Sequence, residues 1–152
     1  MDKEEEKIRI DKKIAEFKDK CRLNGLRITP QRLAIYKALV ETKTHPTAEE
    51  VYSQVQKEFS NISLDTVNRT LLTLSEIGAA FIVEGTGQPR RYDGGLENHQ
   101  HFRCIKCGTI MDFYYEPYDK LDIPDYLQVT VLRKTVYLEG LCGICSGMPA
   151  FH

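Results

Sequence analysis

Apolar residues recur at helical spacing through most of the first eighty residues of the chain. The first stripe advances in steps of four, three and four and comprises Ile10, Ile14, Phe17 and Cys21. This spacing predicts an amphipathic helix that ends near Gly25, a residue suited to a helix C-cap. Because Cys21 lies on the apolar stripe, we interpret it as a core residue without a redox role.

Three further helices are predicted from their N-caps and apolar faces. Thr29-Pro30 opens one, the capping box Thr47–Glu50 opens the next, and Ser63 opens the third. Gly78 closes the last of them. Their apolar positions are, in order, Leu33, Ile35, Tyr36 and Leu39; Val51, Val55 and Phe59; and Leu64, Val67, Leu71 and Leu74.

Two extended runs follow the helices, Ala79–Glu84 and Arg90–Asp93, with Gly85-Thr86-Gly87 between them, which predicts a hairpin. Short helices followed by a hairpin form a winged-helix domain, in which the third and fourth helices would be the helix-turn-helix. The polar face of the fourth helix suits contacts with bases and phosphates. It carries Thr66, Asn68, Arg69 and Thr73. A small helical bundle without a ligand is the alternative that this pattern leaves open.

Composition and charge narrow the class of protein. With 41% hydrophobic and 28% charged residues among 152, the chain is typical of a globular protein. No apolar run approaches the roughly 18 residues of a membrane span, and the acidic N-terminus is unlike a signal peptide, so we expect a cytoplasmic protein without membrane contact. Residues 12–37 hold eight basic side chains against two acidic ones, whereas residues 94–152 hold five against seven. A dimer would double this basic patch and attract DNA, although a solvated helix surface has the same appearance.

Four of the five cysteines form two Cys-x-x-Cys pairs, Cys104/Cys107 and Cys142/Cys145, and Gly108 follows the first. One such pair could be a redox dithiol, but two pairs predict a tetrahedral structural zinc site. The 34 intervening residues must fold themselves. We expect a strand at Thr109–Phe113, a short helix near Pro117–Ile123, and one or two strands within Leu127–Leu138.

Two of the four histidines stand close together, His99 and His101. On a strand, this spacing places both on one face, and Asp112 would lie across the predicted hairpin from them. Imidazole and carboxylate ligands suit Fe²⁺, Mn²⁺ or Zn²⁺ better than a soft metal. Asp93 ends the preceding strand and His45 lies in a loop, but spacing alone does not bring these two residues to the pair.

Six motifs resemble the ferric uptake regulator (Fur) superfamily in order and spacing, over about residues 15–145. They are Gly25-Leu26-Arg27-Ile28-Thr29-Pro30-Gln31-Arg32, His45-Pro46-Thr47-Ala48-Glu49-Glu50-Val51-Tyr52, Thr66-Val67-x-Arg69-Thr70-Leu71, Arg91-Tyr92-Asp93, His99-x-His101-x-x-Cys104-x-x-Cys107-Gly108 and Gly140-x-Cys142-x-x-Cys145. The resemblance implies an α+β chain with a winged helix-turn-helix DNA-binding domain at residues 1–93. A small α/β dimerisation domain with the Cys₄ zinc site would follow at 94–152.

The resemblance also assigns residues to sites. It implies that the structural Zn²⁺ is held by Cys104, Cys107, Cys142 and Cys145. It implies that a regulatory Fe²⁺ or Mn²⁺, or Zn²⁺ in their place, is held by His45, Asp93, His99, His101 and Asp112. We expect DNA contacts from Arg27, Arg32, Thr66, Asn68 and Arg69. The implied partners are operator DNA and a second copy of the chain, with no small organic substrate. Metal binding that fixes the angle between the two domains would couple metal and DNA binding.

The two carboxylates at the implied regulatory site, Asp93 and Asp112, resemble the peroxide-sensing PerR branch, whereas the iron-sensing branch tends to have glutamate there. In the PerR branch, bound Fe²⁺ reacts with hydrogen peroxide and a ligand histidine is oxidised, here His45 or His99. The alternative within the family is an iron- or zinc-level sensor that does not respond to peroxide.

Several positions depart from the family pattern. Asn68 replaces a tyrosine that is usual on the recognition helix, which leaves the operator sequence open. Asn98, Gln100 and Lys134 stand where several members have metal ligands, so no third metal site is expected. The segment between Asp112 and Leu127 is short, which predicts a reduced helix in the dimerisation domain.

Two readings from other classes of protein are weaker. A metalloenzyme would need a general base beside an open metal position, and none is evident, so we expect no catalytic residues and no enzymatic activity. The metalloenzyme would also leave the helix-turn-helix without a role. The other reading is a Cys₄ zinc module that binds only protein, which a failure to bind any duplex DNA in the presence of Mn²⁺ would favour.

Overall fold

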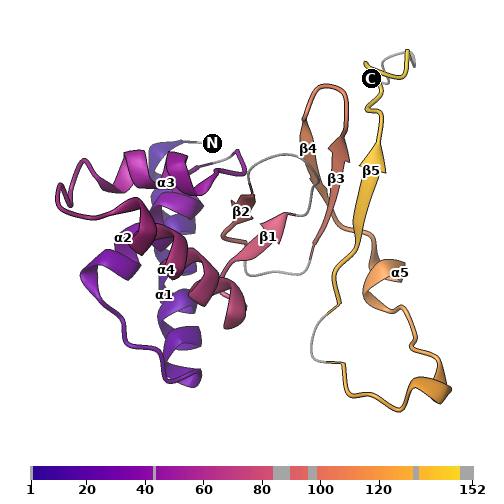
Figure 1. The fold of residues 1–152 in the computed structure, drawn as a ribbon, viewed down its shortest axis with the longest axis horizontal. Coiled ribbons are helices and arrows are strands. Elements are labelled where there is room, and N and C mark those ends of the chain that lie inside the picture. Colours follow the sequence, from indigo (N-terminus) through magenta and orange to yellow (C-terminus); the bar gives the residue numbers. More distant parts are fainter. Residues whose placement is uncertain (1, 43, 84–89, 96–98, 132–133, 148–152) are drawn as a thin grey trace. The chain divides into compact units, whose positions relative to one another are not determined.

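The computed structural model describes residues 2–42, 44–83, 90–95, 99–131 and 134–147. Its helices and strands confirm the predicted α+β class, and the chain divides into two units, Met1–Leu96 and Glu97–His152 (Figure 1). Within the described ranges, no helix is long and apolar enough to cross a membrane.

Unit 1 follows the order of elements in a winged-helix domain. Its elements are α1 (Lys3–Leu23), α2 (Pro30–Glu41), α3 (Ala48–Val55), α4 (Leu64–Glu76), β1 (Phe81–Val83) and β2 (Arg91–Asp93). The two strands pair antiparallel, with Ile82 opposite Tyr92. The predicted turn of this hairpin, Gly85-Thr86-Gly87, lies outside the described residues.

The predicted helix caps are present. The hydroxyls of Thr29, Thr47 and Ser63 each accept a hydrogen bond from the backbone N–H three residues ahead, at 3.2, 3.2 and 3.1 Å. Such a bond satisfies one of the first-turn N–H groups that have no partner inside the helix. Gly25 and Gly78 end α1 and α4 with φ of 67° and 75°, the left-handed conformation in which glycine has no steric penalty.

A single apolar core joins the four helices and the hairpin of unit 1. At its centre, the rings of Phe17 on α1 and Tyr36 on α2 stack with centroids 4.1 Å apart. Cys21 is fully buried in the same core, as its place on the apolar stripe predicted. Deleting a buried ring of this kind typically costs about 3–5 kcal/mol, so the stack fixes α1 against α2.

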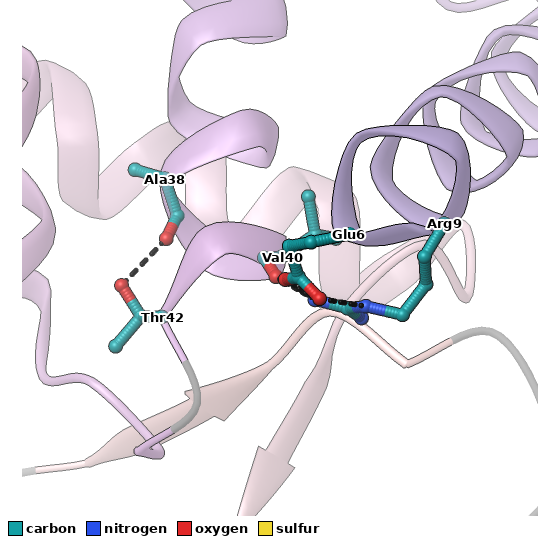
Figure 2. Close-up of polar contacts among 5 residues, drawn as sticks. All are labelled: Glu6, Arg9, Ala38, Val40 and Thr42. Carbon is teal, nitrogen blue, oxygen red and sulfur yellow. Dashed lines mark hydrogen bonds and ion pairs between the residues drawn. The ribbon is translucent and has the colours of Figure 1, made fainter. Parts of the chain in front are cut away.

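Arg9 ties the first helix to the end of the second (Figure 2). Its guanidinium donates to the backbone carbonyl of Val40 at 3.1 Å and forms an ion pair with Glu6. Thr42 donates its hydroxyl proton to the carbonyl of Ala38 at 2.7 Å. The bond from Arg9 satisfies a carbonyl of the last turn of α2, and the hydroxyl of Thr42 adds a second bond to the carbonyl of Ala38, which also accepts the backbone N–H of Thr42. They hold the point at which the chain enters the loop of His45.

Two predicted boundaries in unit 1 differ from the structure. The first helix begins at Lys3, well before the apolar stripe, because Asp2 accepts hydrogen bonds from two backbone N–H groups and caps it. The third helix ends at Val55, four residues before Phe59, although Phe59 still packs against the core. An apolar position one turn past a helix end keeps the helical spacing, which is why the pattern extended the helix.

Unit 2 is built on a three-stranded sheet with strand order β4-β3-β5. Its strands are β3 (Gln100–Cys104), β4 (Ile110–Phe113) and β5 (Tyr137–Gly140), where β4 is antiparallel and β5 parallel to β3. Between β4 and β5 lie the short helix α5 (Glu116–Asp119) and the 3₁₀ turn η1 (Asp125–Leu127). The predicted strand at Thr109–Phe113 corresponds to β4.

Two expectations for unit 2 were partly wrong. The helix predicted near Pro117–Ile123 is the single turn of α5, and no side chain caps its start. The extended run Leu127–Leu138 contains a strand only from Tyr137 onward among its described residues. Val129 and Val131 remain 59% and 42% exposed, so no described part of the chain covers this run.

Candidate metal centres and DNA-binding face

The topology of unit 2 brings the four cysteines of the two Cys-x-x-Cys pairs together. Cys104 ends β3, and its Cα is paired with Gly140 at the end of the parallel strand β5. Parallel strands present their carboxyl ends at one edge of a sheet, so the two turns that follow these strands meet there. The backbone N–H of Ile105 bonds to the carbonyl of Gly140 at 2.9 Å and joins the turns directly.

The geometry of this cysteine cluster suits a tetrahedral ion. One Sγ atom from each of Cys104, Cys107, Cys142 and Cys145 lies within 4.8 Å of the others. The Sγ atoms of Cys107 and Cys142 are 3.8 Å apart. Four sulfurs at a Zn–S distance of about 2.3 Å would be separated by about 3.8 Å, so the sulfurs already lie near the spacing of a zinc site.

Both turns have the backbone arrangement of a zinc knuckle. The N–H groups of Cys107 and Cys145 point at the Sγ atoms of Cys104 and Cys142, at 3.5 and 3.4 Å. Gly108 has a φ of 77°, which allows its N–H to reach the carbonyl of Cys104 at 2.9 Å. Gly108 therefore closes the first turn, as the motif predicted.

The protonation of these thiols also favours a bound cation. Backbone hydrogen bonds, first that from Cys107, lower the pKa of the Cys104 thiol to about 6. Hydrogen bonding with Cys142 raises the pKa of Cys145 to about 12. The four thiols thus influence one another's ionisation, and a divalent cation stabilises all of them as thiolates.

A second cluster in unit 2 consists of nitrogen and oxygen donors. His101 on β3 faces Asp112 on β4 across the antiparallel pair, and its Nε2 lies 3.3 Å from the carboxylate. The Nε2 atom of His99, just before β3, lies 3.1 Å from that of His101. Ligands bound about 2.1 Å from one ion are about 3.0–3.4 Å apart, so the His99–His101 pair and the His101–Asp112 pair each have the spacing of two donors to one ion. The predicted placement of Asp112 across from the histidines is confirmed.

Unit 1 contributes a histidine–carboxylate pair of its own. The Nε2 atom of His45, in the loop between α2 and α3, lies 3.6 Å from a carboxylate oxygen of Asp93 at the end of β2. The other carboxylate oxygen of Asp93 accepts the N–H of Gly95 at 2.7 Å. Sequence spacing left it open whether His45 approaches Asp93, and the structure brings the two together.

Arg91 is a residue of this region that the sequence analysis did not single out. Its guanidinium donates to the backbone carbonyl of His45 at 2.8 Å. The backbone N–H of Tyr92 bonds to the carbonyl of Pro46 at 2.9 Å, and Thr47 forms a β-bridge with Arg91. The loop of His45 is therefore fastened to β2. An arginine bonded to a main-chain carbonyl carries no spacing signal, although Arg91 stands inside one of the quoted motifs.

Gln100 and Lys134, which depart from the family pattern, both make side-chain hydrogen bonds within unit 2. Gln100 is buried; its amide donates to the carboxylate of Asp119 at 3.0 Å and accepts the N–H of Tyr115 at 2.8 Å. The Lys134 ammonium donates to the carbonyls of Asp119 and Leu121. The bonds of Gln100 hold α5 against the sheet, and those of Lys134 hold its ammonium group at the end of α5. Asn98 lies outside the described residues.

The side chains expected to contact DNA lie at two places in unit 1. Arg32, in the first turn of α2, donates to the carbonyl of Arg27 at 2.7 Å. On α4, the hydroxyl of Thr66 bonds to that of Ser63, and Arg69 forms an ion pair with Asp65. Asn68 is exposed between them.

A winged-helix unit joined to a unit with thiolate and histidine–carboxylate clusters defines a metal-binding transcription regulator. The chain belongs to the Ferric uptake regulator family, whose model matches residues 23–131. The resemblance inferred from the six motifs is thereby confirmed.

Individual relatives and solved structures agree with this family assignment. The chain is 38% identical over 130 residues to the "Peroxide-responsive repressor PerR" of Staphylococcus saprophyticus, covering 82% of this chain and 86% of the relative. It is similar to the peroxide stress regulator of Campylobacter jejuni, with 33% identity and a TM-score of 0.62 over 74% of this chain and 85% of that one. The Helicobacter pylori ferric uptake regulator shares the fold, with a TM-score of 0.66 at 22% identity over 90% of this chain and 93% of that one.

Proposed function

We propose that this chain is a homodimeric, metal-dependent repressor that binds operator DNA and releases it when peroxide oxidises a metal ligand. The observation that carries the proposal is the position of His101, whose Nε2 lies 3.1 Å from that of His99 and 3.3 Å from the Asp112 carboxylate, each the spacing of two donors to one ion. Relatives that carry the name peroxide-responsive repressor match most of the chain, which supports the same signal. The proposed roles of the domains are DNA binding for residues 1–93 and metal binding and dimerisation for residues 94–152.

The cysteine cluster is proposed to hold a structural Zn²⁺. Four thiolates fill the coordination of zinc and leave no open position for chemistry. Among the described residues of unit 2, the one buried apolar side chain is that of Cys104. A unit with so little apolar core requires another source of stability, and a metal bound only in the folded state provides it.

The regulatory ion is proposed to be Fe²⁺ or Mn²⁺, with Zn²⁺ as a substitute, bound by both histidine–carboxylate clusters. Unit 1 offers His45 and Asp93, and unit 2 offers His99, His101 and Asp112. Two ligands are too few for a stable site, and three leave positions open, whereas five nitrogen and oxygen donors nearly fill the coordination of these ions. An ion that needs ligands from both units would fix their relative orientation and so favour the DNA-binding state.

The proposed peroxide response is an oxidation within this ligand set. When Fe²⁺ is bound, the chemistry it supplies is the reductive cleavage of the peroxide O–O bond beside an imidazole. In the net reaction, a ring C–H of His45 or His99 and H₂O₂ give an oxygenated imidazole and water. The oxidised side chain is a poorer ligand, so the ion and then the DNA are lost. Mn²⁺ in the same site would support repression without this step.

Dimerisation of unit 2 is supported by its exposed apolar side chains. Twelve large hydrophobic residues are exposed among the described residues of unit 2, against three in unit 1. A dimer interface would cover an exposed apolar excess of this kind. Val129 and Val131 belong to this set. The segment that the sequence predicted as a strand would be covered by the partner copy.

The DNA-binding face is proposed to be the polar side of α4, with Arg27 and Arg32 of unit 1 as phosphate contacts. The roles proposed for Thr66, Asn68 and Arg69 are contacts to the major groove and its flanking phosphates. No enzymatic activity is proposed, because the histidine oxidation consumes the protein's own ligand. A metal-level sensor that ignores peroxide is the second candidate, because nitrogen and oxygen donors also bind iron and zinc without redox chemistry.

The test is DNA binding at controlled metal. Duplexes are first selected from a random pool with the Mn²⁺-loaded chain, and binding is then followed by fluorescence anisotropy across a Mn²⁺ titration. We expect His101→Ala to abolish the Mn²⁺-dependent binding while one zinc per chain is retained. His152→Ala removes the one histidine outside the proposed ligand set and serves as the matched control. Unchanged Mn²⁺ dependence in His101→Ala, or no selected duplex at all, would contradict the proposal.

A further inference from the structure

Asn68 differs from its polar neighbours on α4 because its side chain makes no hydrogen bond with any residue that the structure describes. The hydroxyl of Thr66 is engaged by Ser63 at the helix cap, at 2.9 Å. The guanidinium of Arg69 is paired with Asp65 one turn earlier. Asn68 is therefore the side chain of this trio whose donor and acceptor are both available to a ligand, and it is exposed.

Asn68 also lines a surface groove of about 380 Å³ within unit 1. Leu64 and Leu72 lie one helical turn before and after it and form apolar walls of this groove. Tyr92 of the hairpin lines it as well. An amide between two leucines offers hydrogen bonds at one point and apolar contact beside it. That combination suits the edge of a nucleobase better than a phosphate.

The charges at the groove agree with a base edge as its occupant. Glu49, at the start of α3, lines the groove, and its carboxylate repels phosphate. Arg90 lines the groove too; it is exposed and forms no ion pair with any described residue. Arg90 is thus available to a DNA phosphate beside the base that Asn68 contacts.

We infer that Asn68 recognises adenine in the major groove of the operator, which rests on the proposed function of α4 in DNA binding. In the major groove, adenine presents the N7 acceptor beside the N6 donor, and an asparagine amide pairs with both: its Oδ1 accepts from N6–H and its Nδ2 donates to N7. The thymine of an A·T pair presents a 5-methyl group, for which Leu64 and Leu72 supply the apolar contact. Asn68 is then the residue of this chain that specifies one A·T pair in each half-site.

The inference is tested by selecting duplexes from a random pool with the Mn²⁺-loaded full-length chain and with Asn68→Ala. Glu76→Ala, an exposed position at the far end of α4 that does not line the groove, is the matched control. We expect the wild type and the control to fix an adenine at one position per half-site. Asn68→Ala should lose the preference at that position alone. Circular dichroism is expected to show the same helix content for all three proteins, since Asn68 makes no internal hydrogen bond.

A second measurement identifies the contacted atoms. Replacing the selected adenine by 7-deazaadenine removes N7 and leaves N6, so it should weaken wild-type binding by about 2- to 12-fold, the range for one neutral hydrogen bond. The same replacement should leave the affinity of Asn68→Ala unchanged. Replacing its partner thymine by uracil should cost the wild type a smaller factor.

The outcomes separate this inference from the proposed function. If the wild type selects no sequence from the pool, sequence-specific DNA binding itself is contradicted. If it selects a sequence and Asn68→Ala selects the same one with the same preference at every position, the role of Asn68 is overturned while DNA binding stands. Equal loss of affinity for 7-deazaadenine in the wild type and in Asn68→Ala would also overturn it.

Discussion

The guanidinium of Arg91 donates a hydrogen bond of 2.8 Å to the backbone carbonyl of His45. Arg91 lies two residues before Asp93 on β2, so this bond fixes the loop of His45 beside the carboxylate with which His45 pairs. Residues that orient metal ligands in this way typically contribute a factor of about 10–100 to metal affinity.

Arg91→Ala is therefore expected to weaken Mn²⁺ binding by about tenfold or more, because the loop of His45 loses its side-chain anchor. The backbone bond from Tyr92 to Pro46 remains, so unit 1 should stay folded. Competition with a fluorescent chelator measures the affinity, and the neighbouring Arg90→Ala is the control, because Arg90 makes no such bond to the loop. Wild-type Mn²⁺ affinity in Arg91→Ala would contradict this role.

The cysteine cluster gives a prediction about stability and assembly. Cys142→Ser should lose the proposed zinc, unfold unit 2 and convert the proposed dimer to monomers, because the described part of unit 2 has little apolar core of its own. Zinc content by atomic absorption and mass by light scattering are the measurements. Cys21→Ala changes a cysteine of the unit 1 core and is expected to keep one zinc per chain. A Cys142→Ser protein that keeps its zinc would show that the cluster is not the zinc site.

The tether at Arg9 gives a prediction for unit 1 alone (Figure 2). Arg9→Met should lower the free energy of unfolding by about 1–3 kcal/mol, since it removes a charged hydrogen bond to Val40 and the ion pair with Glu6. Arg22→Met breaks an exposed ion pair with Asp19 on the same helix, which is worth about 0–1 kcal/mol. Urea denaturation compares the two. An equal loss in both variants would mean that the bond to Val40 adds nothing.

Most of unit 1 could be predicted from the sequence because its signals are local. Caps such as Thr29 and Ser63 act within one helical turn, and the apolar stripes mark the faces that meet in the core. The approach of Asp112 to His101 was also predictable, because a short hairpin fixes which residues face each other. By contrast, the bond from Arg91 to His45 joins residues 46 positions apart through a backbone carbonyl, which every residue has.

The second unit was harder to predict for a different physical reason. The alternating valines at Val129 and Val131 have the pattern of a strand, but a strand forms only where a neighbouring edge supplies hydrogen bonds and apolar cover. The sheet of unit 2 has the order β4-β3-β5, and residues 129–131 are not paired with either of its edge strands. Val129 and Val131 therefore have the alternation of a buried strand, but the described residues of one chain do not bury them, which agrees with the proposed dimer.

Peroxide sensing is tested most directly by peptide mass spectrometry of the chain loaded with Fe²⁺ or with Mn²⁺ and treated with low hydrogen peroxide. We expect a gain of one oxygen atom on the peptides of His45 or His99, confined to the Fe²⁺ sample and accompanied by loss of DNA binding. Unmodified histidines in a sample with proven iron occupancy would contradict peroxide sensing. They would identify the chain as a sensor of metal level.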